Sequence, residues 1–281
     1  MDIDIAQLRG WIGRQETLTD IVTPFPVAAL AATLDRDDPA PRDGDPLPPL
    51  WHWLYFLPRA PQSQIGPDGH PRRGGFLPPV SLPRRMWAGG RLTFPGTLRI
   101  GDTITRTSTI ADVTFKEGRS GALVFVLVRH EIAGPGGLAI TEEQDIVYRD
   151  AARPGDAPPP ARPAPSGAGW HRDILPDPVL LFRYSALTFN SHRIHYDRRY
   201  GTEAEGYPGL VVHGPLLATL LVDLARRNDP RPITGFRFRA QNPVFDIAPF
   251  TTCGRVEGEK AALWAQRSDG SLGMDAEAVF G

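Results

Sequence analysis

Apolar residues in the last third of the chain recur at the spacing of one helix face. The repeat comprises Leu216, Leu217, Leu220, Leu221 and Leu224. This spacing predicts an amphipathic helix with a broad buried face. His213-Gly214-Pro215 provides a helix start with a proline in the first turn, and Asn228-Asp229-Pro230 provides a stop.

Strand patterns account for most of the remaining sequence. Residues 103–115, 121–132 and 138–148 are rich in Val, Ile, Thr and Phe, and glycine-containing turns separate them. They predict an antiparallel meander. Residues 236–241 alternate apolar and polar side chains, as in a strand with one buried face. Further strands are predicted at 251–257, 261–267 and 273–280.

Shorter helices are predicted ahead of both groups of strands. Helical patterning occurs around 5–12 and 27–34, and another helix runs to Leu187 from Asp177, an N-cap residue followed by proline. Residues 151–169 are rich in Pro, Ala and Gly and predict an extended linker. We therefore expect an α+β organisation used twice, with one part at 1–150 and the other at 170–281.

Composition narrows the functional classes. The formal net charge is −1 and no run of like charge stands out, so we expect no nucleic-acid partner. Cys253 is the only cysteine, which excludes an intramolecular disulfide and a cysteine-rich metal site. The N-terminus lacks the pattern of a signal peptide, and the longest aliphatic and aromatic run, 123–128, is too short to cross a bilayer. We expect a cytoplasmic protein without membrane association.

The densest polar cluster lies at 188–197. It contains His192 and His195, and His213 follows at the start of the Leu-rich helix. Histidine exchanges protons near neutral pH, and the Gly214 N–H at a helix N-terminus can stabilise a developing oxyanion. A base together with an oxyanion donor is what proton removal beside a thioester carbonyl requires.

Three other interpretations of this cluster stay open at the level of sequence. The histidines could be surface loop residues without a role. His192, His195 and Asp197 have a spacing that permits a metal site, although no familiar ligand pattern is present, and we expect no metal. His213-Gly214-Pro215 could serve only to start a helix.

Two blocks of sequence resemble the MaoC-like hydratases and dehydratases. Residues 184–197 read YSALTFNSHRIHYD and residues 206–216 read GYPGLVVHGPL. They are most similar to the branch of type 2 hydroxyacyl-thioester dehydratases and mesaconyl-C4-CoA hydratases, and residues 83–90 resemble its first half. The resemblance implies a double hot-dog fold, in which each half wraps an antiparallel sheet around a long helix. It also implies a degenerate, substrate-binding first half and a second half that carries the catalytic loop.

The family motif can be carried over residue by residue. Its acid corresponds to Asn190, its asparagine to His192 and its proline to Arg193, whereas its histidine is retained as His195 and its glycine as Gly214. An amide side chain cannot act as a general base. The resemblance therefore implies that His195 carries the proton transfer. The first half shows no such loop, so we expect one active site, in the second half and facing the first.

Roles for the other residues follow from the same resemblance. Asn190 would orient the water or the substrate carbonyl, and the Gly214 N–H would bind the thioester oxygen. Substrate-binding residues are expected at Tyr184, His192, Arg193 and His213, with Arg193 a candidate for a free carboxylate of the substrate. No cofactor is expected, because CoA is part of the substrate.

The implied function is hydration of a short enoyl-CoA, with mesaconyl-C4-CoA converted to citramalyl-CoA as the best candidate. One alternative is a 3-hydroxyacyl-thioester dehydratase of fatty acid synthesis. A non-catalytic subunit that binds acyl thioesters is an alternative of another class, and a thioesterase using Asp197 is a further one. Exposed edge strands favour a homodimer by analogy with the family.

Overall fold

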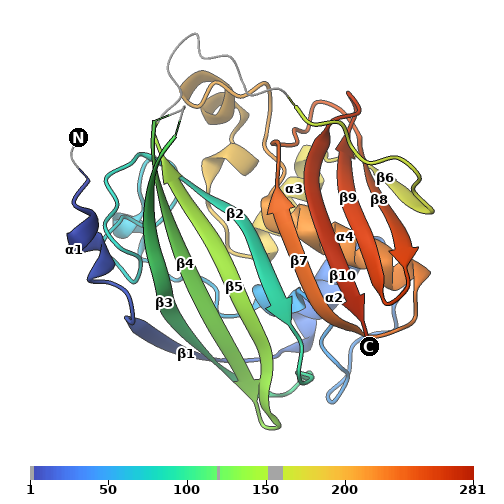
Figure 1. The fold of residues 1–281 in the computed structure, drawn as a ribbon. Helices are drawn as coiled ribbons and strands as arrows, with labels where there is room; N and C mark the ends of the chain where they lie inside the picture. Colours follow the sequence, from blue (N-terminus) through green and yellow to red (C-terminus); the bar gives the residue numbers. More distant parts are fainter. Residues whose placement is uncertain (1–2, 119–120, 151–160) are drawn as a thin grey trace.

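The computed structural model describes residues 3–118, 121–150 and 161–281. Within them, ten strands form one continuous sheet in the order β1-β3-β4-β5-β2-β7-β10-β9-β8-β6, and each neighbouring pair is antiparallel (Figure 1). The N-terminal strands are β1 (Gln15–Ile21), β2 (Arg84–Thr93), β3 (Thr103–Gly118), β4 (Gly121–Gly134) and β5 (Gly137–Arg149). The C-terminal strands are β6 (Trp170–Ile174), β7 (Ile233–Ala240), β8 (Phe250–Glu257), β9 (Lys260–Arg267) and β10 (Leu272–Phe280).

Four α-helices accompany the sheet in the described residues. They are α1 (Ile5–Arg9), α2 (Pro24–Thr33), α3 (Pro178–Leu187) and α4 (Gly214–Asn228). The first is shorter than the predicted 5–12, because the chain leaves the helix at Gly10 and turns at Gly13, where φ is 85°. The second begins earlier than predicted because a proline fits the first helical turn. The predicted cap of α3 is confirmed: the Asp177 carboxylate accepts a hydrogen bond from the Leu180 N–H at 2.8 Å.

The two halves join where β2 pairs with β7. Gly89 and Gly90 lie at this seam, opposite Arg239 and Phe238. A Cβ atom at Gly89 would lie only 2.6 Å from the Phe238 carbonyl oxygen, so the close approach of the strands requires glycine. Because β2 also pairs with β5, the N-terminal and C-terminal strands form one sheet rather than two separate ones.

Helix α4 lies behind the C-terminal strands in Figure 1 and is the centre of a core shared by both halves. Its residues Leu216 to Ala225 are all buried, including the polar Thr219 and Asp223. The sequence predicted one broad buried face, whereas this stretch of the helix is buried around its whole circumference. The cover from the first half includes Arg36, which pairs with the Asp223 carboxylate. The predicted double hot-dog class is confirmed by this architecture and by the comparisons below.

The predicted linker falls partly outside the described residues, at 151–160. Among its remaining residues, 162–164 pair with the turn between β9 and β10: the Ala164 N–H donates to the Gly270 carbonyl at 3.0 Å, and the Leu272 N–H donates to the Arg162 carbonyl at 2.8 Å. Strand β6 then begins at Trp170, where the second part was predicted to start. The domain boundaries themselves stay a prediction.

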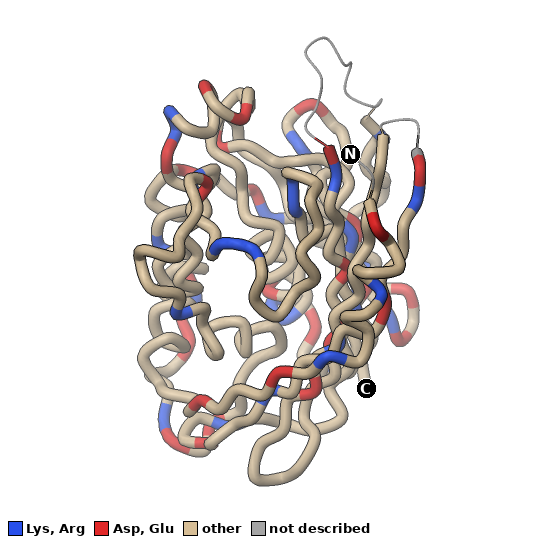
Figure 2. The backbone as a smooth tube through the Cα atoms, turned by 90° about the vertical axis from the view of Figure 1, so that its left-hand side faces the viewer, with Lys and Arg blue, Asp and Glu red and all other residues tan. Residues whose placement is uncertain are grey.

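Figure 2 shows Lys and Arg positions interspersed with Asp and Glu positions over the described backbone. The expectation that the protein has no nucleic-acid partner stays a prediction. None of the helices in these segments is long and apolar enough to cross a membrane.

Candidate active site

The loop after α3 positions the candidate base. Phe189 adopts a left-handed conformation with φ 47° just beyond the helix, and the Asn190 N–H donates back to the Ser185 carbonyl at 2.8 Å. The chain then forms a 3-10 turn from Arg193 to His195. The result is that His195 points into the protein rather than toward solvent, with 7% of its surface exposed.

His195 is held in one orientation and one protonation state. Its Nδ1–H donates to the Val211 carbonyl oxygen at 2.7 Å, and the Val211 N–H donates to the Ile194 carbonyl at 3.0 Å. Burial lowers the pKa of His195 to about 4, and the hydrogen bond to Val211 only partly opposes this. With Nδ1 carrying the proton, Nε2 keeps a lone pair at neutral pH, as a general base requires.

His213 packs against the face of the His195 ring. The two imidazole rings are stacked, with centroids 3.7 Å apart and planes at 17°. His213 is fully buried, its Nε2 lies 2.8 Å from the Ser185 hydroxyl, and the Tyr184 ring contacts it edge-on at 5.1 Å. Burial lowers the pKa of His213 well below its ordinary value and raises that of Tyr184. This burial favours a supporting role for both residues over the substrate contact predicted from the sequence.

Gly214 is the first residue of α4, directly after His213. Its N–H belongs to the group of helix N-terminal donors that have no partner inside the helix. A Cβ atom built at Gly214 meets nothing within 4 Å, so the space beside it is open among the described residues. No described residue accepts a hydrogen bond from this N–H, and the His195 ring stacks on the residue that directly precedes it.

Two other predicted residues are engaged within the loop. The Asn190 Oδ1 accepts the His192 N–H at 3.0 Å, which leaves its NH₂ group as the part that can reach a ligand. Arg193 donates to the Asp197 carboxylate at 2.7 and 3.0 Å and to the Pro67 carbonyl at 2.9 Å. These bonds tie the loop together and to the first half, so the structure gives Arg193 a holding role, and a contact with the substrate carboxylate stays a prediction.

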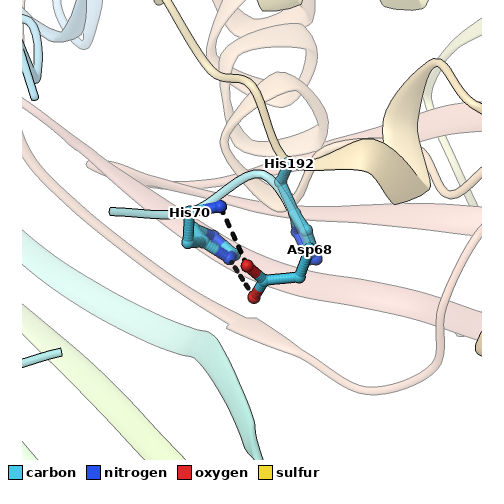
Figure 3. A group of neighbouring side chains, drawn as sticks. All are labelled: Asp68, His70 and His192. Carbon is cyan, nitrogen blue, oxygen red and sulfur yellow. Dashed lines mark hydrogen bonds and ion pairs between the residues drawn. The ribbon is translucent and has the colours of Figure 1, made fainter. Parts of the chain in front are cut away.

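The first half contributes two residues that the sequence reasoning missed, Asp68 and His70 (Figure 3). The Asp68 carboxylate accepts the His70 N–H at 3.0 Å with one oxygen and lies 3.0 Å from the His70 Nδ1 with the other. The His70 ring lies 4.0 Å from the ring of His192, whose ring in turn meets His195 edge-on at 5.4 Å. Four of the seven histidines in the chain therefore form a row across the junction of the two halves.

Comparison with known proteins shows the family of this chain. The profile of the hydroxyacyl-thioester dehydratase type 2 family matches residues 50–246. The mesaconyl-C4-CoA hydratase of Chloroflexus aurantiacus is 52% identical over 98% of this chain and 99% of its own length. This chain belongs to the hydroxyacyl-thioester dehydratase type 2 family. The mitochondrial enzyme of that name from Schizosaccharomyces pombe is 29% identical over 89% of this chain and 92% of its own.

Solved structures agree on the fold of this family member. A MaoC-like dehydratase from Phytophthora capsici superposes with a TM-score of 0.69, at 15% identity, over 99% of both chains. A Mycobacterium tuberculosis protein described as having a double hotdog fold superposes with a TM-score of 0.58, at 13% identity, over 95% of this chain and 96% of its own. At these identities the likeness shows the fold alone, and it confirms the double hot dog predicted from the motifs.

The protein also has a cluster of side chains of types that can bind a cation. Donor atoms of Asp68, His70 and His192 lie within 4.8 Å of one another. This set differs from the one that the sequence suggested, which was His192, His195 and Asp197. In the structure the Asp197 carboxylate forms an ion pair with Arg193. In the structure Asp68 and His70 hydrogen-bond to each other, which is the arrangement of an acid that orients an imidazole. The prediction that the enzyme uses no metal stays a prediction.

Proposed function

We propose that this protein hydrates mesaconyl-C4-CoA to citramalyl-CoA. The observation that carries the proposal is the 52% identity to a mesaconyl-C4-CoA hydratase over nearly the whole of both chains. The site supports it, because His195 Nε2 and the Gly214 N–H have no hydrogen-bond partner among the described residues, and the His195 ring stacks on His213, directly before Gly214. They supply a candidate base and a candidate oxyanion donor. Family membership favours a hydro-lyase over a non-catalytic binding subunit or a thioesterase.

The reaction can be assigned to these groups step by step. His195 Nε2 removes a proton from water as the water oxygen bonds to C3 of the enoyl thioester. The electron pair of the C2–C3 double bond moves toward the thioester carbonyl, whose oxygen is stabilised by the Gly214 N–H at the positive end of α4. The enolate then collapses as C2 takes up a proton. Asn190, through its NH₂ group, would orient the water or the carbonyl.

The proposal is tested by the substrate range of the purified protein. Mesaconyl-C4-CoA, crotonyl-CoA and a longer enoyl-CoA are compared by the loss of enoyl-thioester absorbance, while a thiol reagent detects hydrolysis. We expect rapid loss of absorbance with mesaconyl-C4-CoA and no release of free thiol. A clear preference for the longer enoyl-CoA would favour the 3-hydroxyacyl-thioester dehydratase of fatty acid synthesis, and thiol release would favour a thioesterase.

We also propose a cytoplasmic homodimer, in which an edge of the sheet is covered by a second copy. Strands β1 and β6 form the two edges of the ten-stranded sheet and each has a strand partner on one side only among the described strands. Light scattering of the purified protein should give a mass of two chains. A monomer mass would contradict this assembly without affecting the catalytic assignment.

A further inference from the structure

The acid of the family motif is replaced by Asn190, yet a carboxylate reaches the same loop from the first half. We propose that His70, oriented by Asp68, is the second proton-transfer group of this active site and replaces the motif acid. The inference rests on the proposed hydratase function, since it assigns the proton delivered to C2. It also gives the first half, predicted to be a degenerate substrate-binding unit, a part in the chemistry.

The segment that carries this pair is fixed to the catalytic loop by specific bonds. The Arg193 N–H donates to the Asp68 carbonyl at 2.9 Å, and the Ser191 hydroxyl donates to the Gly69 carbonyl at 2.6 Å. Gly69 has a φ of 91°, and a Cβ atom there would lie 1.8 Å from the Ser191 carbonyl oxygen. Only glycine permits this approach, so the chain between Asp68 and His70 is built to lie against the loop.

A carboxylate partner distinguishes His70 from the other histidines of the row. Burial and the nearby His70 and His195 lower the pKa of His192 to about 2, so His192 is neutral near pH 7. Burial acts to raise the pKa of Asp68, but its hydrogen bonds from His70 prevail and hold the pKa below the usual range. Asp68 is therefore an anion that accepts hydrogen bonds from both the backbone N–H and the ring Nδ1 of His70. His70 is the member of the row that is hydrogen-bonded to a carboxylate among the described residues.

In the proposed hydration, His195 and His70 carry out different proton transfers. His195 begins neutral and accepts the proton of water as the oxygen bonds to C3. His70, whose Nδ1–H is held by Asp68, delivers a proton from Nε2 to C2 as the enolate collapses to the thioester. One proton then returns from His195 to His70 by way of solvent, which restores both groups. The reverse sequence removes water from the 3-hydroxyacyl thioester.

The test uses the full-length protein and the hydration assay on mesaconyl-C4-CoA. His70→Gln should lower kcat by about 100-fold or more with little change in KM, as expected when an acid/base group is lost. Asn190→Asp restores a carboxylate at the motif position. In the His70→Gln background, this second change should recover at least about tenfold in kcat. Asp68→Asn, which keeps the shape of the segment, should also lose activity and be recovered by Asn190→Asp.

A matched control separates the loss of this imidazole from the loss of any imidazole. His171→Gln makes the same substitution at an exposed histidine of β6 that has no part in the site, and it should keep kcat within about threefold of the wild type. The proposal is overturned if His70→Gln keeps near-normal kcat, if Asn190→Asp gives no recovery, or if His171→Gln loses as much as His70→Gln. Activity lost to a chelator and restored by Zn²⁺ would show a metal site instead. Failure of the wild type to consume any enoyl-CoA would contradict the proposed function itself.

Discussion

The protonation state of His195 gives a prediction about the pH dependence of activity. A histidine with an ordinary pKa of 6.5 would be only about one-tenth in its basic form at pH 5.5. Burial lowers the pKa of His195 to about 4, so nearly all of the enzyme keeps the basic form at that pH. We therefore expect kcat/KM for hydration to stay close to its neutral value, as far as His195 is concerned, until the pH falls toward 4.

The same shift has a consequence for stability. The difference between 6.5 and about 4 corresponds to about 3 kcal/mol of preference for the neutral form of His195 in the folded state. The unfolded chain binds the proton first as the pH falls. Stability is therefore present in full above about pH 6.5 and is lost progressively toward pH 4. His195→Gln removes this contribution, so the variant should lose less stability on acidification than the wild type.

Two measurements check this reasoning. Initial rates of mesaconyl-C4-CoA hydration are recorded from pH 4.5 to 8, with samples returned to pH 7 to detect irreversible inactivation. Urea denaturation at pH 7 and pH 5 compares the wild type with His195→Gln. An acid limb of kcat/KM centred between pH 6 and 7, or equal acid sensitivity of the two proteins, would refute the assignment of His195 as a buried neutral base.

Three further changes test the packing that holds the site. Gly69→Ala should cost roughly 1–3 kcal/mol of stability, because it forces a side chain into a left-handed conformation against Ser191, and should lower kcat; thermal denaturation and hydration rates measure both. Asp223→Ala should cost about 3 kcal/mol in urea denaturation, because it removes the buried carboxylate that three arginines share and leaves Arg227 without an ion-pair partner among the described residues. Gly89→Val should separate β2 from β7 and cost roughly 1–3 kcal/mol; a variant as stable as the wild type would contradict the close approach at the seam.

Much of the fold was predictable because its elements carry periodic patterns. The meander of β3, β4 and β5 was located from its strand-forming residues and the turns between them, and the Leu-rich α4 from helical spacing. Strand β2 was recognised only as a motif, because its Gly89-Gly90 pair interrupts the pattern of a strand. Glycine is needed at these positions because the backbone of β7 lies close to them, although β7 is nearly 150 residues further along the chain. A local sequence pattern cannot indicate such a distant contact.

The candidate site likewise combines residues that local sequence motifs identify with residues that they do not. His195, Asn190 and Gly214 come from two contiguous segments that the motif identified, and the structure brings His195 and the start of α4 together. Asp68 and His70 lie in a stretch rich in Pro and Gly, where periodicity gives no signal. Their contacts with the loop at 190–193 span more than 120 residues of sequence. The one available hint was an acid and a histidine flanking a glycine.

The central claim is that His195 is the base of a hydratase. The most direct measurement is the hydration of mesaconyl-C4-CoA in H₂¹⁸O by the wild type and by His195→Ala, with the product analysed by mass spectrometry. The account predicts one ¹⁸O atom in the C3 hydroxyl of the wild-type product and a rate at least about 100-fold lower for folded His195→Ala. Near-normal turnover by that variant, or consumption of the thioester without incorporation at C3, would contradict it.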